Sequence, residues 1–197
     1  MPDLRLTAAE TAPPLGVVLA GGGGRRMGGA KATVSLEGRS LLEYPVRALQ
    51  SALLEVVVVA KPDTVLPSLH GTAVWAEPSP RRHPAVGIAH ALGLAGGRWV
   101  LVCAGDMPLV SEAMLRALLD ADPGRASAVV PRHAGRPEPL LALYGPEALP
   151  GLREDSDRPL REIVADLAPR LIEAEDSQTF FNVNRPEDLL EAAARLL

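Results

Sequence analysis

The sequence predicts an α/β fold in which a mostly parallel sheet is covered by helices on both faces. Short, valine-rich apolar runs alternate along the chain with longer segments of helical periodicity. Strands buried on both faces of a parallel sheet form continuous apolar runs, and their alternation with helices is typical of βαβ units. The 197 residues, of which 47% are hydrophobic and 22% charged, suit one globular domain. We therefore expect an N-terminal tail over 1–14 and a single domain over 15–197.

Most predicted helices carry a recognisable signal at one end. Ser40 and Glu43 form a capping-box pattern, Gly96 follows a helical segment, and Pro186 suits the first turn of a closing helix. The stretch 126–176 is less regular and predicts an antiparallel insertion. The predicted strands span 15–20, 55–60, 72–76, 98–103, 126–130, 139–144 and 180–183. The predicted helices span 40–54, 84–94, 111–121, 158–167 and 186–196.

Composition excludes several classes of function. The net charge of −4 leaves no overall positive charge for nucleic acid or an anionic membrane surface. The chain has no apolar stretch long enough to cross a membrane, and residues 1–10 lack the apolar core of a signal peptide. The single cysteine, Cys103, excludes an intrachain disulfide and is interpreted as a small buried hydrophobe. These features predict a cytoplasmic protein.

The most informative segment is a glycine-rich loop that directly follows the first predicted strand. Its four consecutive glycines allow close approach of the backbone to a ligand, and Arg25, Arg26 and Lys31 add positive charge. Together these features predict a polyphosphate site, and the alternative is a glycine-rich turn with solvated arginines. The nucleotide-binding residues predicted here are Leu19, Ala20, Gly21, Gly22, Gly23 and Lys31.

The spacing of this loop differs from two better-known phosphate-binding loops. Counted from Gly23, the second glycine of a P-loop would be Gly28, but Gly29 then stands where that motif requires lysine. In the Rossmann fingerprint, the third glycine would fall on Arg26 or Met27. The loop is therefore neither a P-loop nor a dinucleotide-binding turn.

The loop resembles the signature of another family. It has the pattern Leu-Ala-Gly-Gly, three residues, Arg-Met-Gly, two residues, Lys, over Leu19–Lys31. This pattern is similar to the signature loop of the sugar-nucleotide pyrophosphorylase type of nucleotidyltransferase, and most similar to that of the molybdenum cofactor guanylyltransferases. The related cytidylyltransferases generally carry Leu-Ala-Ala-Gly, so Gly21 favours the guanylyl branch. The resemblance covers about 15–189 and implies a three-layer, Rossmann-like nucleotidyltransferase fold.

Two further motifs predict a magnesium site. Asp106 follows the buried strand 98–103, at the sheet edge where α/β folds place ligands, although a turn aspartate is an alternative. Phe181-Asn-Val-Asn184 resembles the closing motif of the family, which implies that Asn184 completes the metal shell. The same resemblance implies that Asn182 contacts the acceptor or positions a metal-bound water. Without the family, Asn184 and Glu187 also fit a helix-capping box.

Other positions match the family less closely. Arg136, in a segment that resembles the acceptor side of the family, is a candidate for the molybdopterin phosphate, as is Arg158, and solvated arginines are the alternative. Val59 stands in a region that contacts the base, where the family often has an asparagine, and Glu77 stands near a site usually held by aspartate. The resemblance implies that both, together with Asp106, bind the nucleotide. Ala30 replaces an aspartate that commonly precedes the loop lysine. The valine at 59 removes one possible hydrogen bond to the base, whereas phosphate binding does not depend on these three positions.

The resemblance implies a defined reaction. GMP would pass from GTP to molybdopterin, pyrophosphate would leave, and Mg²⁺ would be the cofactor, with Arg26, Lys31 and Asp106 as catalytic residues. Transient contact with molybdoenzymes or other cofactor-biosynthesis proteins would follow. One alternative is a transferase of the same fold that uses CTP or another acceptor phosphate. Another is a catalytically weak protein that hands the cofactor to an apo-enzyme.

Overall fold

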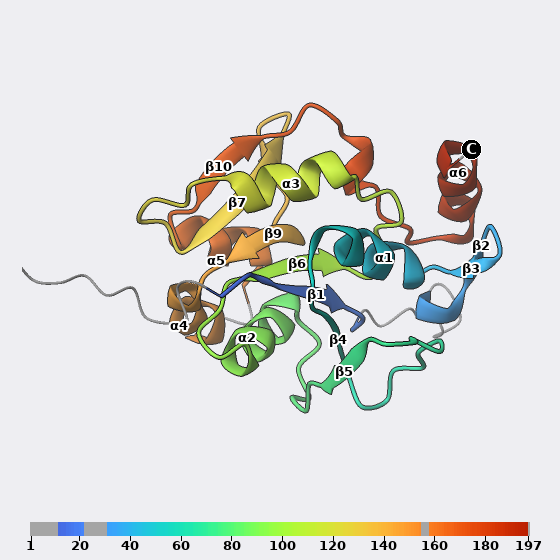
Figure 1. Ribbon diagram of the computed structural model, residues 1–197, viewed down its shortest axis with the longest axis horizontal. Helices are drawn as coiled ribbons and strands as arrows, with labels where there is room; N and C mark the ends of the chain where they lie inside the picture. Colours follow the sequence, from blue (N-terminus) through green and yellow to red (C-terminus); the bar gives the residue numbers. More distant parts are fainter. Residues whose placement is uncertain (1–11, 22–30, 155–157, 197) are drawn as a thin grey trace, which may run out of the picture.

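The computed structural model describes residues 12–21, 31–154 and 158–196. An eight-stranded sheet forms the middle layer, with α1 and α3 on one face and α2, α4 and α5 on the other (Figure 1). The strand order is β10-β7-β9-β6-β1-β4-β5, and β8 pairs with β7. This arrangement confirms the predicted α/β class. No helix in the described ranges has the length and apolar character needed to cross a bilayer.

The strands and helices have the following bounds. The strands are β1 Leu15–Leu19, β2 Ser35–Leu36, β3 Arg39–Ser40, β4 Val56–Ala60, β5 Ala73–Ala76, β6 Val100–Ala104, β7 Ala128–His133, β8 Arg136–Pro137, β9 Leu141–Tyr144 and β10 Arg170–Glu173. The α-helices are α1 Glu43–Ala52, α2 Pro84–Leu94, α3 Glu112–Asp120, α4 Leu149–Glu154, α5 Leu160–Asp166 and α6 Pro186–Leu196. The 3-10 turns are Lys31–Thr33, Pro146–Ala148 and Gln178–Phe180.

Strand direction confirms the expected antiparallel insertion. β1 pairs in parallel with β4 and β6, and β4 pairs in parallel with β5. β9 runs antiparallel to both of its neighbours, β6 and β7. β10 returns parallel to β7. The carboxyl ends of β5, β4, β1 and β6 therefore meet at one edge of the sheet, where α/β proteins bind ligands.

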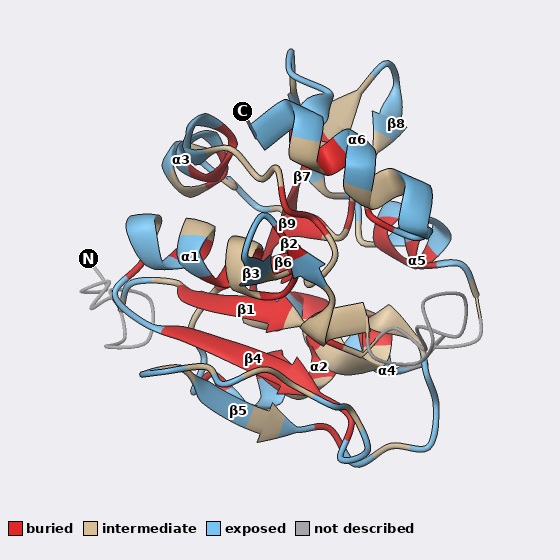
Figure 2. Ribbon diagram, turned by 90° about the vertical axis from the view of Figure 1, so that its right-hand side faces the viewer, coloured by how far each residue is buried: buried red, intermediate tan, exposed pale blue. Residues whose placement is uncertain are grey.

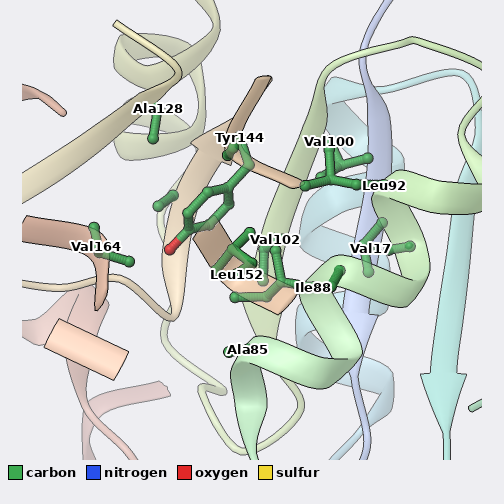
Figure 3. Close-up of a cluster of buried hydrophobic side chains, with 14 of the residues drawn as sticks. Val17, Ala85, Ile88, Leu92, Val100, Val102, Ala128, Tyr144, Leu152 and Val164 are labelled. Atoms are coloured by element: carbon green, nitrogen blue, oxygen red, sulfur yellow. The ribbon is translucent and has the colours of Figure 1, made fainter. Parts of the chain in front are cut away.

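The apolar core lies on both faces of the sheet, as the continuous apolar runs predict (Figure 2). Successive residues of β1 face opposite layers: Val17 packs towards α2, and Val18 packs towards α1 and α3. In the first of these layers, Ile88 of α2 and Val102 of β6 pack in the same cluster as Tyr144 (Figure 3). The Tyr144 hydroxyl donates to the carbonyl of Pro139 at 2.7 Å, so its buried polar atom is satisfied.

The predicted strand over 180–183 is wrong. A 3-10 turn occupies Gln178–Phe180, and the next four residues carry no strand. Phe181 and Val183 instead pack with Leu36 and Leu41, outside the main sheet. Their apolar character therefore reflects this small cluster and not a sheet position. The small hairpin β2–β3, which supplies Leu36, was not predicted from the sequence.

The capping signals also act differently from the expected pattern. Oε2 of Glu43 accepts hydrogen bonds from the backbone N–H and the hydroxyl of Ser40, both at 2.7 Å. These bonds lower the pKa of the Glu43 carboxyl, because they stabilise its charged form. The Ser40 hydroxyl is therefore a donor here and does not cap the first amides of α1. At α3, by contrast, Ser111 accepts from the backbone N–H of Met114, as an N-cap should.

Candidate active site

A cavity of about 250 Å³ opens at the carboxyl ends of the parallel strands. Gly21 reaches it after β1, Lys61 after β4, Glu77 after β5 and Asp106 after β6. Each of these residues lies just past a strand, so the topology of the sheet brings together positions that are far apart in the chain. A cavity at this edge agrees with the general location of ligands in α/β folds.

Two polar side chains that line this cavity, Lys31 and Asp106, meet a third side chain, that of Asn184. Nζ of Lys31 lies 2.5 Å from Oδ2 of Asp106 and 3.0 Å from Oδ1 of Asn184. The side chains of Lys31 and Asp106 are 15% and 24% exposed, so the ion pair remains open to a ligand. Two oxygen atoms and one cationic nitrogen therefore converge on one point, which is the arrangement expected where phosphates and a metal ion bind.

Close packing between β1 and β6 positions Asp106. The backbone N–H of Gly105 donates to the carbonyl of Leu19 at 2.9 Å. A Cβ atom at Gly105 would lie 2.8 Å from Cδ1 of Leu42 and 3.0 Å from the Leu19 carbonyl oxygen. A glycine is therefore needed here, because the end of β6 approaches the start of the glycine-rich loop too closely for any side chain.

The C-terminal segment positions Asn184. The backbone N–H of Val183 donates to the Asp106 carbonyl at 2.9 Å, which fastens this segment beside the end of β6. Oδ2 of Asp188 accepts from the N–H groups of Asn184 and Arg185, at 2.6 Å and 2.9 Å. Asp188, in the first turn of α6, therefore fixes the two backbone N–H groups that precede this helix. Oδ1 of Asn184 accepts from Lys31, and α6 begins only at Pro186, so the alternative interpretation of Asn184 as a capping residue is wrong.

A small apolar cluster supports this segment from behind. Leu36, Leu41, Val183 and Ala192 are all buried in it, and they connect the β2–β3 hairpin with α6. Leu41 immediately precedes Leu42, whose backbone N–H donates to the carbonyl of Ala32 at 3.3 Å, next to Lys31. The cluster therefore holds the segments of Lys31 and Asn184 together, although 153 positions separate the two residues in sequence.

The cavity also includes two further positions predicted to bind the nucleotide. Val59 and Glu77 both line it, and Val59 is buried at the end of β4. Glu77 forms an ion pair with Lys61, a residue that was not predicted from the sequence. The signal for Lys61 was present, because a lysine directly after a fully apolar strand lies at the ligand-binding edge of the sheet.

The three predicted acceptor residues are not among the described residues that line this cavity. The side-chain amide of Asn182 donates to the Phe180 carbonyl at 2.8 Å, a local contact. Arg158 pairs with Asp166 at 2.7 Å, and Arg136 lies exposed on β8. The predicted residues Gly22, Gly23 and Arg26, together with Ala30, lie outside the described residues.

Cys103 is a core residue, as the sequence predicts. Cys103 is fully buried within β6. Burial, and to a smaller degree the charge of Asp106, raises the pKa of its thiol well above the usual range. A thiol that stays protonated is a poor nucleophile, so Cys103 has no place in the chemistry of the neighbouring cavity.

Comparison with known proteins identifies the family. The profile described as the MobA-like NTP transferase domain matches residues 16–172. A probable molybdenum cofactor guanylyltransferase from Opitutus terrae is 33% identical over 193 residues, covering 92% of this chain and 95% of that protein. A protein of the same description from Bacillus mycoides is 30% identical over 188 residues, covering 90% of this chain and 94% of its own.

A solved structure agrees with these relatives. Molybdopterin-guanine dinucleotide biosynthesis protein A from Archaeoglobus fulgidus superposes with a TM-score of 0.74 and 25% sequence identity, covering 92% of this chain and 98% of that one. The sequence relatives and the fold therefore lead to the same family, as the glycine-rich loop predicts. The chain belongs to the family of MobA-like NTP transferases and is a nucleotidyltransferase.

Proposed function

We propose that this enzyme transfers GMP from GTP to molybdenum-molybdopterin, with release of pyrophosphate. The observation that carries the proposal is the convergence of Lys31, Asp106 and Asn184 at the edge of the cavity. The names of the relatives from Opitutus terrae and Bacillus mycoides support guanylyl transfer within the molybdenum cofactor pathway. After the reaction, the product would pass to molybdoenzymes or other cofactor-biosynthesis proteins by transient contact.

The residues at this edge fit a magnesium ion. Oδ2 of Asp106 and Oδ1 of Asn184 both lie within hydrogen-bond distance of the same Lys31 nitrogen, so they converge on a position that a cation already occupies. Magnesium in nucleotide enzymes usually takes one or two protein oxygens, with phosphates and water completing its shell. When bound to these two oxygens in place of the Lys31 ammonium group, Mg²⁺ would neutralise phosphate charge and make the α-phosphorus more electrophilic, and Lys31 would be free to contact the phosphates.

In this proposal the protein's own groups bind the triphosphate and neutralise the charge of the leaving group. Backbone N–H groups of Gly21, Gly22 and Gly23 would hold the triphosphate, and Arg26 and Lys31 would neutralise the departing pyrophosphate. An oxygen of the acceptor phosphate forms a bond to the α-phosphorus, and the bond to the oxygen that bridges the α- and β-phosphorus atoms breaks. The attacking oxygen is already anionic, so the reaction needs positioning more than a general base.

The test is a comparison of substrates with the purified protein. Molybdopterin, Mg²⁺ and one of GTP, CTP, UTP or ATP are supplied, and pyrophosphate release is measured together with the nucleotide attached to the pterin. We expect the highest kcat/KM with GTP. A higher kcat/KM with CTP, or release only with a different acceptor phosphate, would contradict the proposal in favour of a related transferase. Nucleotide binding without any pyrophosphate release would instead favour a cofactor-handover role.

A further inference from the structure

A buried ion pair forms the end of the cavity opposite Lys31 and Asp106. Lys61 and Glu77 directly follow the register partners Ala60 and Ala76, the last residues of β4 and β5. Their side chains are 8% and 4% exposed, and both line the cavity. Burial of two charges is costly unless each finds a partner and further hydrogen bonds. A pair at the ligand-binding edge therefore needs an explanation beyond stability.

The ammonium group of Lys61 donates hydrogen bonds to three acceptors of the protein itself. It donates to Oε2 of Glu77, to the Ser79 carbonyl at 2.6 Å and to the Arg81 carbonyl at 2.5 Å. An ammonium group has three N–H donors, so Lys61 has none left for a ligand unless it gives up one of these partners. Lys61 therefore holds the segment after β5 in place and is not itself the group that contacts a nucleotide.

Each oxygen of the Glu77 carboxylate accepts one hydrogen bond within the protein and can accept another from a ligand. Oε2 accepts from Lys61, and Oε1 accepts from the backbone N–H of Ser79 at 2.6 Å. A carboxylate offers about four lone-pair positions, so about two remain for donors in the cavity. Without Lys61, the same buried carboxylate would lose its counter-ion and one of its two hydrogen-bond donors, so its orientation would no longer be fixed.

We propose that Lys61 is a positioning residue for base selection, which acts by holding the Glu77 carboxylate in a fixed place at the cavity. This inference rests on the proposed guanylyl transfer and adds a specificity mechanism to it. Guanine presents two adjacent donors, N1–H and the N2 amino group, and a fixed carboxylate is complementary to both. Cytosine and adenine place an acceptor beside their amino group, which would face the negative charge of Glu77 unfavourably.

The experiment compares Lys61→Met, Glu77→Gln and the double variant by steady-state kinetics. GTP is measured against CTP and against inosine triphosphate, which lacks the N2 amino group. We expect Lys61→Met to lower the kcat/KM preference for GTP over each competitor by about tenfold or more, mainly through KM. If Lys61 acts through Glu77, the double variant shows no greater loss of preference than Glu77→Gln alone.

A matched control separates base selection from general stability. Arg98→Met removes a cation that contacts Glu55 and the Pro13 carbonyl at the opposite end of the strands. This variant should lower thermal stability without changing the base preference. If Lys61→Met does not fold, Lys61→Gln also removes the charge while keeping a donor, and it should show the same loss of preference. A folded variant that lacks the lysine charge and retains the wild-type preference would overturn the inference.

The two proposals fail in different ways. If the wild-type protein prefers a base other than guanine, guanylyl transfer is wrong, and the role of Lys61 is judged by whether Lys61→Met weakens that other preference. If the wild-type protein prefers GTP but Lys61→Met changes only the melting temperature, guanylyl transfer stands and the positioning role is wrong. A wild-type protein without any base preference would contradict both.

Discussion

The ammonium nitrogen of Lys31 lies 2.5 Å from Oδ2 of Asp106, although 75 positions separate the two residues along the chain. Lys31 follows the glycine-rich loop and Asp106 follows β6, so this contact connects the predicted phosphate site with the predicted metal site. The contact depends on the parallel pairing of β1 with β6, which brings their carboxyl ends together.

Replacement of Asp106 by asparagine should remove activity and preserve the fold. The substitution keeps the size of the side chain but removes the negative charge, so metal binding weakens and kcat should fall about a hundredfold or more. The measurement is pyrophosphate release over a range of Mg²⁺ concentrations. The control is Arg116→Gln on α3, where an exposed pair with Glu112 contributes little. Turnover close to wild type at ordinary Mg²⁺ concentrations would show that Asp106 is not a metal ligand.

Lys31→Met should affect both binding and turnover. The methionine retains most of the aliphatic length and loses the charge that faces the phosphates, so kcat/KM should fall about a hundredfold or more. A rise in the KM for GTP together with a lower kcat would indicate contact with the phosphates in both the ground state and the transition state. An unchanged kcat/KM in a folded variant would exclude the proposed role of Lys31 in charge neutralisation.

Gly105→Ala should destabilise the protein and displace Asp106. The added Cβ would approach the Leu19 carbonyl oxygen, a backbone atom, to 3.0 Å, and such overpacking typically costs about 1–3 kcal/mol. The matched control is Gly93→Ala in α2, where the Cβ would meet only the end of the Arg153 side chain at 3.3 Å. Denaturant unfolding should therefore show a loss at 105 and little change, or a gain, at 93. Equal unfolding free energies for the two variants would refute the argument from close packing.

Cys103 should be unreactive in the folded protein. Burial raises the pKa of its thiol, so both access and thiolate concentration are low. Alkylation by iodoacetamide at pH 8 should be at least about tenfold slower in the native protein than in guanidinium chloride. Mass spectrometry after timed quenching provides the measurement. Equal rates in the two states would mean that β6 opens readily or that the thiol is accessible.

Local sequence patterns predicted the framework of the protein. Continuous apolar runs identified β1, β4 and β6, because strands buried on both faces need apolar residues at every position. Asp106 could also be placed at the ligand-binding edge, because it follows the apolar run of β6 and α/β sheets bind ligands at the carboxyl ends of their strands. The same reasoning failed for Phe181 and Val183, because an apolar pair does not reveal whether it packs in a sheet or in a satellite cluster.

The sequence alone thus determined the alternation of strands and helices, the phosphate-binding character of the loop and the family resemblance, all of which depend on short-range patterns. Only the tertiary structure decided which side chains meet. Asn184 contacts Lys31 because Val183 is hydrogen-bonded beside the end of β6, and Lys61 contacts Glu77 because β4 and β5 pair in register. Such contacts join residues from separate strands, and their geometry depends on strand order and register, which no local pattern encodes.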